Sequence, residues 1–225
     1  MQLSSRDIHS HLLPGVDDGF QNEELSLRAI GIMAENGCKK LALTPHVNPD
    51  VNADMTEDRL RLVYEGFVPK IPKEWGLSVS LAAEYMVVSG FEERASKPDE
   101  LLTFEDRSIL IEMSYMYRSR NMEKVLFELN MAGLKPIVAH PERYPYMMEC
   151  LEDFEKWHDM GCRFQLNFMS LTGKYGISSI KIMKYLFKHG LYDFVSTDLH
   201  GLGQLDAIIS KKPCRLSLRK YKDLL

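Results

Sequence analysis

The chain has 225 residues, of which 45% are hydrophobic and 27% charged, an ordinary composition for a globular protein with one sizeable core. A formal net charge of -4 and a pI near 6.0 give no reason to expect a nucleic acid or an anionic membrane as a partner. The sequence shows no signal-peptide pattern, no apolar run long enough to span a bilayer, and no CxxC pair among its four cysteines. We therefore expect one cytoplasmic domain, residues 1–225, with reduced cysteines and no membrane insertion.

Short apolar runs alternate with stretches of helical periodicity along most of the chain. The predicted strands are a short one that closes at 7–8 and others at 40–44, 77–83, 107–111, 135–139, 163–167 and 193–197. The predicted helices cover 23–36, 56–67, 121–131, 151–160 and 177–189. Asn22 is placed to cap the first helix, and Gly37 and Gly133 are placed to end two of them. We expect 91–105 to be irregular and the tail from Pro213 to be a surface segment or a last helical turn.

The alternation of strands and helices predicts an α/β fold with a parallel sheet. With about seven such units, a closed or distorted (β/α)7 barrel competes with an open doubly wound sheet. Polar residues decide between the two, because they fall at the C-terminal ends of different predicted strands. These residues are His9, His11, His46, Glu84, Glu112, His140, Asp198 and His200. In a barrel those ends meet at one rim, whereas an open sheet spreads them along a line, so we predict a TIM-like barrel.

The loop after the first strand carries the densest set of polar residues. His9 and His11 are separated by one residue, so an extended strand points both side chains to the same face. Asp17 and Asp18 follow as oxygen donors, in a loop that Pro14, Gly15 and Gly19 bend. This loop predicts one half of a metal site. Asp18 is the better ligand candidate, and Asp17 is expected to shape the loop.

The remaining chain supplies the other half of that site. Five of the seven histidines fall in loops flanked by proline, glycine or acidic residues, whereas His158 and His189 lie on or at the end of helices and fit a structural role. Burying five histidines and several carboxylates on one rim is prohibitive without cations to compensate. We therefore predict two or three metal ions. Imidazole and carboxylate ligands without thiolate fit manganese, iron or zinc better than calcium, magnesium or copper(I).

Arg143 follows the predicted ligand His140 directly. It either pairs with Glu142 or, beside a cationic cluster, binds an anion, and a guanidinium suits phosphate. We favour a phosphate clamp. The predicted reaction is hydrolysis of a phosphomonoester by metal-bound hydroxide, with Asp18 or His200 as the proton donor to the leaving oxygen. The sequence does not choose between these two donors.

Several other residues have more than one interpretation. A group of tyrosines follows predicted strand ends and either lines a cleft or packs at the rim: Tyr115, Tyr117, Tyr144 and Tyr146. The methionines nearby are better explained as core residues: Met113, Met116, Met147 and Met148. In the second predicted helix, Leu60 and Leu62 are expected to face the core.

Four motifs resemble those of the bacterial capsular-polysaccharide tyrosine phosphatases, the CpsB/CapC (YwqE-like) group of the PHP superfamily. They are His9-Ser10-His11-Leu12-Leu13-Pro14-Gly15-Val16-Asp17-Asp18-Gly19, Thr44-Pro45-His46, Ala139-His140-Pro141-Glu142-Arg143 and Thr197-Asp198-Leu199-His200. The match runs in order over most of the chain. The resemblance implies a distorted seven-stranded barrel, the PHP fold, with three metal ions that are usually assigned as manganese. It also implies a substrate, the phosphotyrosine-rich tail of a tyrosine autokinase that controls exopolysaccharide assembly.

The resemblance further implies how the ligands divide among the ions. His9, His11, Glu84 and Asp198 would hold the first ion, and Glu84 would bridge to a second ion held by Glu112 and His140. A third ion would be held by the remaining candidates, Asp18, His46 and His200.

The chain departs from the family pattern after its last motif. Family members similar to the Gram-positive enzymes carry a second phosphate-binding arginine there, but 201–207 contains none, and Arg215 is too far along. Lys174 is a candidate to assist Arg143, and Gly201-Leu202-Gly203 suggests a looser loop. Two alternatives stay open: a small-molecule phosphatase of histidinol-phosphate type, and a weakly catalytic regulatory binder on the same scaffold.

Overall fold

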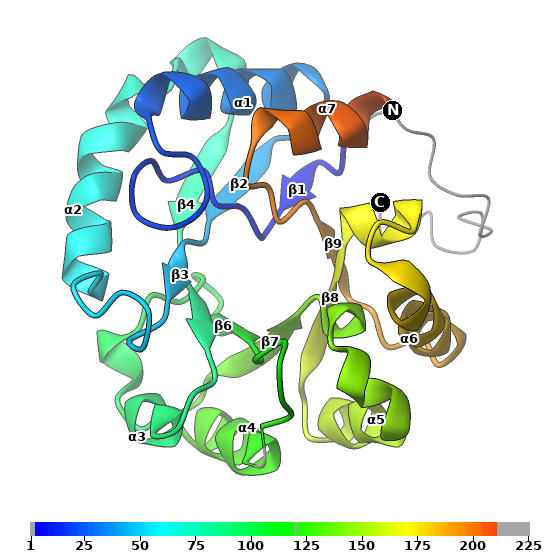
Figure 1. The fold of residues 1–225 in the computed structure, drawn as a ribbon. Coiled ribbons are helices and arrows are strands. Elements are labelled where there is room, and N and C mark those ends of the chain that lie inside the picture. Colours follow the sequence, from blue (N-terminus) through cyan, green and yellow to red (C-terminus); the bar gives the residue numbers. More distant parts are fainter. Residues whose placement is uncertain (1–2, 120, 211–225) are drawn as a thin grey trace.

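The computed structural model describes residues 3–119 and 121–210, and its strands form two sheets in which every pairing is parallel (Figure 1). The first sheet has the order β1 (Arg6–Asp7), β2 (Lys40–Leu43), β4 (Ser78–Leu81). The second has the order β3 (His46–Val47), β5 (Glu84–Met86), β6 (Ser108–Glu112), β7 (Lys135–Ala139), β8 (Arg163–Asn167), β9 (Phe194–Ser196). The α/β fold with parallel strands is therefore confirmed. The predicted tail from Pro213 lies outside the described residues.

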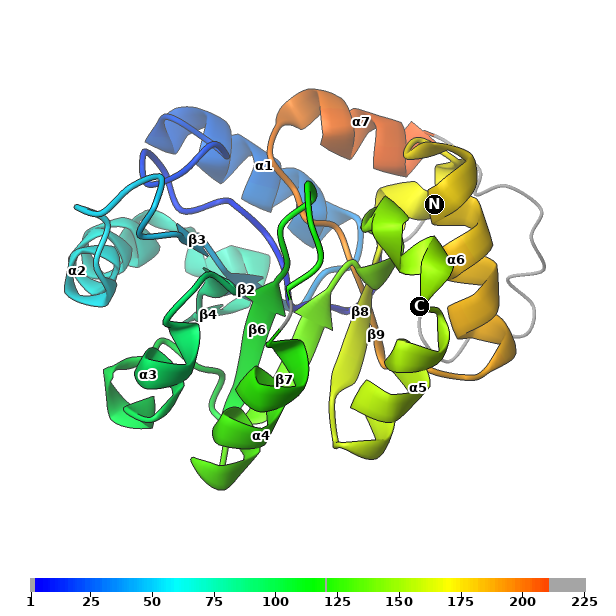
Figure 2. The same cartoon turned by 60° about the horizontal axis from the view of Figure 1, so that its bottom comes forward.

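Helices surround the strands on the outside of the molecule (Figures 1 and 2). They are α1 (Glu23–Glu35), α2 (Glu57–Phe67), α3 (Phe91–Ala95), α4 (Met122–Met131), α5 (Glu152–Asp159), α6 (Gly176–Lys188) and α7 (Leu202–Ser210). Short 3-10 helices cover Val68–Lys70, Lys73–Trp75, Pro98–Glu100, Pro141–Arg143, Pro145–Glu149 and Phe168–Thr172. Within the described part of the chain, none of the helices is long and apolar enough to cross a bilayer.

The helix ends follow the local sequence signals. The Asn22 side chain accepts a hydrogen bond of 2.9 Å from the Leu25 N–H, which confirms the predicted cap of α1. Gly37 and Gly133 follow α1 and α4 with positive φ angles of 103° and 72°, a conformation that glycine adopts without steric cost. Leu60 is buried as predicted, but Leu62 is 69% exposed because a two-residue step in a helix points to a different face. Met116, predicted in the core, is 86% exposed on the loop after β6.

Two predicted strands are each interrupted. The predicted strand at 40–44 corresponds to β2, which ends at Leu43. Pro45 separates it from β3, which begins at His46 and belongs to the other sheet. The predicted strand at 77–83 likewise divides into β4 and β5. The chain changes sheets at both points, and the Glu84 N–H donates to the Pro45 carbonyl at 3.0 Å. As a result, His46 and Glu84 begin strands instead of ending them.

Two segments predicted without helices contain them. The expected irregular stretch at 91–105 includes α3, and the expected looser loop after Gly201 is the start of α7. The Leu205 N–H donates to the Gly201 carbonyl at 3.2 Å, which closes the first turn of α7. Both helices are short, so the period of their apolar residues is hard to recognise in the sequence.

The first and last parts of the described chain meet directly beside the polar strand ends. Ser10 and Leu199 form a parallel β-bridge, and the Asp198 N–H donates to the His9 carbonyl at 2.9 Å. The buried Asp7 carboxylate accepts hydrogen bonds of 2.6 Å from the Thr197 hydroxyl and 3.3 Å from its N–H. These contacts place the His9–His11 segment next to the segment that carries Asp198 and His200.

We predict that Gly19→Ala destabilises the protein by about 1–3 kcal/mol, as overpacking does. A Cβ atom at residue 19 would lie 2.2 Å from the His11 carbonyl oxygen and 2.5 Å from the His11 Cβ, so the loop would have to move. Urea unfolding measures the effect. Gly66→Ala in α2 is the control, because its Cβ meets nothing within 4 Å, and alanine should raise the free energy of unfolding by up to about 1 kcal/mol. A Gly19→Ala variant as stable as the parent would contradict the prediction.

Candidate metal centre

The structure brings all nine predicted metal ligands together at one end of the strands. They are His9, His11, Asp18, His46, Glu84, Glu112, His140, Asp198 and His200, which form four overlapping groups whose ligand atoms lie within 4.8 Å of one another. Glu112 is the last residue of β6, and His140 directly follows β7. Six of the nine are buried, whereas His46 and His200 are partly exposed and Asp18 is largely exposed at the outer edge.

The deepest part of the cluster pairs two histidines with two carboxylates. The Nε2 atoms of His9 and His11 lie 3.1 and 3.4 Å from the same Glu84 oxygen. Their distances to one Asp198 oxygen are 3.5 and 3.3 Å. The two Nε2 atoms are themselves only 3.1 Å apart. Two imidazole nitrogens and two carboxylate oxygens therefore converge on one small, buried volume.

The outer nitrogens of these two histidines are occupied by hydrogen bonds. His9 Nδ1 lies 2.9 Å from Gln165 Oε1, and His11 Nδ1 lies 2.7 Å from Asp17 Oδ2. Both partners are acceptors, and the Gln165 amide donates to the Leu166 carbonyl at 2.7 Å, which fixes its orientation. Each Nδ1 therefore carries a hydrogen, and in the neutral ring Nε2 presents a lone pair toward the carboxylates. Such an arrangement orients histidines for a metal ion.

A second part of the cluster contains His46, Glu112 and His140. His46 Nδ1 lies 3.0 Å from Glu84 Oε2 and 3.0 Å from Glu112 Oε1. His140 Nε2 lies 3.1 Å from Glu84 Oε1. Among the described residues of the cluster, Glu112 Oε2 and His140 Nδ1 are buried without a hydrogen-bond partner. Buried polar atoms without partners are costly, so the donor set of this cluster fits bound cations.

The outer part of the cluster joins Asp18 to two histidines. Asp18 Oδ1 lies 3.5 Å from His46 Nε2 and 3.5 Å from His200 Nε2. The His200 ring also stacks on His11, with centroids 3.9 Å apart. The Asp18 side chain is 72% exposed, so this part of the cluster is open to solvent and to a substrate.

The close packing of charges changes the pKa values of several groups in the cluster. Burial lowers the pKa of His9, but Glu84 and Asp198 oppose it and raise the pKa above its usual value. Burial and the nearby His11 lower the pKa of His46, but the Glu84 and Glu112 carboxylates outweigh them and raise it to about 10. Burial raises the pKa of Glu112, and the neighbouring Glu84 carboxylate raises it further. The cluster thus favours added positive charge, which protons or metal ions can supply.

The groups of ligand atoms follow the division implied by the family resemblance only in part. His9, His11 and Glu84 form one group, as implied. His46 groups with Glu84 and Glu112, whereas His140 groups with His9 and Asp198. Which residues share an ion therefore stays a prediction.

Two of the candidate ligands have an unusual backbone. His140 and Asp198 have positive φ angles of 33° and 49°, and Arg107 is the third described non-glycine residue of this kind. Left-handed backbone costs of order 1–3 kcal/mol for such residues and occurs preferentially at functional sites. His140 directly follows β7, and Asp198 lies two residues after the end of β9.

Arg143 lies at the edge of the cluster and pairs with Asp198, with 2.6 Å between Nη1 and Oδ2. The alternative pairing with Glu142 is wrong. The Glu142 carboxylate is buried and accepts hydrogen bonds from the Asn167 N–H, the Ser170 hydroxyl and the Tyr192 hydroxyl: 3.0, 2.6 and 2.9 Å. The Arg143 guanidinium instead lies between two aromatic rings, 4.8 Å from the centroid of Tyr115 and 4.5 Å from that of Tyr175.

Several residues that support the site were missed in the sequence. Gln165 and Asn167 are both on β8, where Gln165 contacts His9 and Asn167 Nδ2 donates to Asp198 Oδ2 at 2.7 Å. Their spacing repeats that of His9 and His11, so two polar residues on one face of an apolar strand were an available signal. Gln204 on α7 donates to the Asp198 carbonyl at 2.8 Å and accepts from the His200 N–H at 3.0 Å. No local pattern marks Gln204.

The remaining candidates divide into those near the site and those away from it. Tyr115 is 38% exposed and stacks on His140, and the fully buried Tyr144 also lies against His140, with ring centroids 5.7 Å apart. His189 pairs with Glu155 at 3.1 Å and stacks on Tyr185, consistent with its predicted structural role. Lys174 Nζ lies 5.5 Å from the centre of the Tyr175 ring, next to Arg143.

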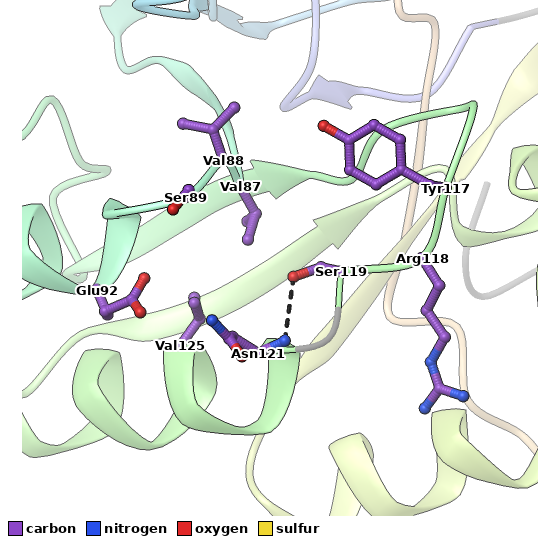
Figure 3. Close-up of a pocket in the computed structure, with 9 residues that line it drawn as sticks. All are labelled: Val87, Val88, Ser89, Glu92, Tyr117, Arg118, Ser119, Asn121 and Val125. Carbon is purple, nitrogen blue, oxygen red and sulfur yellow. Dashed lines mark hydrogen bonds between the residues drawn. The ribbon is translucent and has the colours of Figure 1, made fainter.

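A groove of about 880 Å³ lies between the loop after β5 and the loop after β6 (Figure 3). Its lining residues are Val87, Val88, Ser89, Glu92, Tyr117, Arg118, Ser119, Asn121 and Val125. Figure 3 shows the Tyr117 ring directed toward Val88, across the groove, whereas Arg118 points away. Val87, which lines the groove, donates its N–H to the carbonyl of the candidate ligand Glu112 at 2.9 Å.

The chain is similar to known proteins over most of its length. The family model for capsular polysaccharide synthesis proteins CpsB/CapC matches residues 5–221. Tyrosine-protein phosphatase YwqE of Bacillus subtilis is 26% identical over 206 residues, which are 87% of this chain and 77% of YwqE. Tyrosine-protein phosphatase CpsB of Streptococcus pneumoniae is 30% identical over 207 residues, 87% of this chain and 83% of CpsB.

A solved structure supports the same relationship. It comes from a crystallographic study of YwqE from Bacillus subtilis and CpsB from Streptococcus pneumoniae, which are metal-dependent tyrosine phosphatases. The match has a TM-score of 0.77 at 26% identity and covers 92% of this chain and 87% of that one.

We predict that Asp17→Asn lowers metal affinity about 10- to 100-fold, the usual cost of losing a residue that orients a ligand. An amide in place of the carboxylate weakens the 2.7 Å contact to His11 Nδ1 without changing the size of the side chain. Calorimetric titration of metal-free protein measures the affinity. Asp193→Asn is the matched control, because Asp193 Oδ2 also accepts a backbone hydrogen bond, from the Phe164 N–H at 2.9 Å, and is not part of the cluster. Equal metal affinity in both variants would contradict the orienting role of Asp17.

Proposed function

Because this chain belongs to the CpsB/CapC family, we propose that its buried cluster of histidines and carboxylates is the active site of a metal-dependent protein-tyrosine phosphatase. The observation that carries this proposal is the convergence of imidazole and carboxylate groups beside Arg143. A cluster of this kind binds metal ions, and a guanidinium at its edge binds the phosphoryl group. The two halves of a phosphatase site are thus adjacent.

The proposed metal ligands are the nine residues of the cluster, which have donors enough for two or three ions. Manganese is the proposed metal. Imidazole and carboxylate donors without a thiolate fit manganese, and they fit iron and zinc as well. When bound, such ions lower the pKa of water and neutralise charge on phosphoryl oxygens. Elemental analysis of purified protein distinguishes the three metals.

In the proposed reaction, Arg143 binds the non-bridging oxygens of the phosphoryl group. Its contacts with the Tyr115 and Tyr175 rings hold the guanidinium in place, so that little freedom is lost when substrate binds. Asp18 and His200 remain the two candidates for proton transfer to the tyrosine oxygen. Because Asp18 Oδ1 and His200 Nε2 are 3.5 Å apart, either group is placed to orient the other.

A protein substrate is favoured over a small molecule by the groove beside the cluster. The groove contains Tyr117, which is 63% exposed, and can hold residues that flank a phosphotyrosine. We propose the tail of a bacterial tyrosine kinase that controls exopolysaccharide synthesis as the substrate. Histidinol phosphate would not use this groove, and a strong preference for it would contradict the proposal.

We further propose that the two sheets form one distorted seven-unit barrel, a single domain spanning residues 1–225. The Ser10–Leu199 bridge supports a junction between the first and last strands, and the Glu84–Pro45 hydrogen bond supports one between the sheets. Such a barrel explains how residues that follow different strands reach one site.

We predict that Arg143→Ala lowers kcat/KM for a phosphotyrosine peptide about 10- to 150-fold, the loss expected for a charged hydrogen-bonding group worth about 1.5–3 kcal/mol. Metal content should not change, because arginine is not a ligand. Steady-state kinetics and elemental analysis measure the two quantities. Arg59→Ala on the exposed face of α2 is the control and should behave as the parent. Unchanged kcat/KM in Arg143→Ala would refute the phosphate clamp.

We predict that Tyr117→Ala raises KM for a phosphotyrosine peptide several-fold and leaves KM for phenyl phosphate unchanged, because only the peptide reaches the groove. Phe127→Ala is the control: Phe127 is 55% exposed on α4 and is not among the groove residues. Parallel kinetics on both substrates measure the difference. Equal effects of Tyr117→Ala on both substrates, or none on either, would argue against the groove as the peptide site.

A further inference from the structure

A small pocket lies beside Arg143 and Tyr115, at the edge of the cluster, and shares no lining residue with the groove of Figure 3. Its volume is about 210 Å³. The residues that line it are Tyr115, Glu142, Arg143, Pro145, Tyr175, Ser178 and Ser179. The volume suits a small chemical group, and the lining combines a cation, a carboxylate, two serine hydroxyls and two tyrosine rings.

The N-terminus of α6 opens into this pocket through Ser178 and Ser179. This helix has 13 residues, its first turn contains no acidic residue, and no side chain caps it. The N–H groups of a first helical turn have no partner within the helix, and they carry the positive end of the helix dipole. The Gly176 N–H donates to the Gly173 carbonyl at 3.2 Å, so the other N–H groups of the first turn are the donors available to an anion.

Ser179 gives independent evidence for a ligand. Its side chain is only 4% exposed, and its Oγ is one of the buried polar atoms without a hydrogen-bond partner among the described residues. A buried hydroxyl normally has a partner, because leaving it unpaired is costly. Since Ser179 lines the pocket, a group bound there with acceptor oxygens would supply the missing hydrogen bond.

Arg143 supplies the charge. A guanidinium has five N–H donors, and the bond from Nη1 to Asp198 engages one end of it. The Glu142 carboxylate, although part of the lining, is occupied by hydrogen bonds from the Asn167 N–H and the hydroxyls of Ser170 and Tyr192. The groups left to bind a ligand are therefore donors and one cation.

We propose that this pocket is an anion-binding subsite, in which Ser179 Oγ, the first-turn N–H groups of α6 and Arg143 bind an anionic group of the phosphopeptide substrate. The inference rests on the proposed function for the identity of that substrate. The anionic group is either the phosphoryl group being hydrolysed or an acidic side chain next to the phosphotyrosine.

The main test is Ser178→Asp in metal-loaded protein. An acidic residue suits the first turn of a helix, so the melting temperature should stay the same or rise, whereas the added negative charge should repel an anion in the pocket. We expect Ser178→Asp to bind inorganic phosphate at least about 10-fold more weakly in calorimetric titration, and Ser179→Ala about 5-fold more weakly. Ser178→Ala is the neutral control and should bind phosphate within about 2-fold of the parent, since it keeps the backbone donors.

Kinetics on three substrates distinguish the two sources of the anion. If Ser179→Ala raises KM equally for phenyl phosphate and for phosphotyrosine peptides with neutral or acidic neighbours, the subsite binds the phosphoryl group. If KM rises only for the peptide with acidic neighbours, the subsite binds the neighbouring acid. Phosphate affinity and KM values unchanged in both Ser178→Asp and Ser179→Ala would overturn the proposal.

The same measurements separate this proposal from the proposed function. A parent protein that hydrolyses none of the three substrates would refute the phosphatase activity. The phosphate affinities of the parent and of Ser178→Asp would still test the subsite, because that comparison requires no turnover.

Discussion

The structure depends on compensating the negative charges that are buried close together at one end of its strands. Glu84, Glu112 and Asp198 are almost completely buried. Each lies within a few ångströms of a histidine of the cluster. Burying carboxylates together is strongly unfavourable unless positive charge lies between them. The histidines can supply that charge by taking up protons, and metal ions supply more of it. The need for cations therefore explains the composition of the site and agrees with the metal dependence of YwqE and CpsB.

The surrounding fold orients the ligands as much as it brings them together. Asp17 and Gln165 fix the outer nitrogens of His11 and His9, which directs both Nε2 atoms to the same volume. The Asp17 carboxylate also accepts hydrogen bonds from the N–H groups of Gly19 and His46, at 2.9 and 3.1 Å. One side chain thus connects the shape of the loop to the position of two histidines. Such outer contacts determine how tightly a metal site binds.

The sequence predicted the α/β class, the parallel strands and the nine residues of the cluster, because polar residues after apolar strands are a local pattern. It did not predict that the chain changes sheets at Pro45 and before Glu84, since both junctions depend on hydrogen bonds between distant segments. The partner of Arg143 could not be predicted from the sequence either, because Asp198 is 55 residues away along the chain, whereas Glu142 is adjacent. The helix after Gly201 was missed because a short helix that contains a glycine, Gly203, has weak local signals. Gln165 and Asn167 could have been found from their spacing, whereas Gln204 acts only through tertiary contacts.

The central claim is that the cluster is a multinuclear metal centre for phosphotyrosine hydrolysis. Its most direct test is to return manganese stepwise to chelator-treated protein and to measure the rate of phosphotyrosine-peptide hydrolysis against the number of bound ions per chain. The account predicts no turnover without metal and a rate that rises as the second ion binds. Full activity in metal-free protein, or full activity with a single ion per chain, would contradict it.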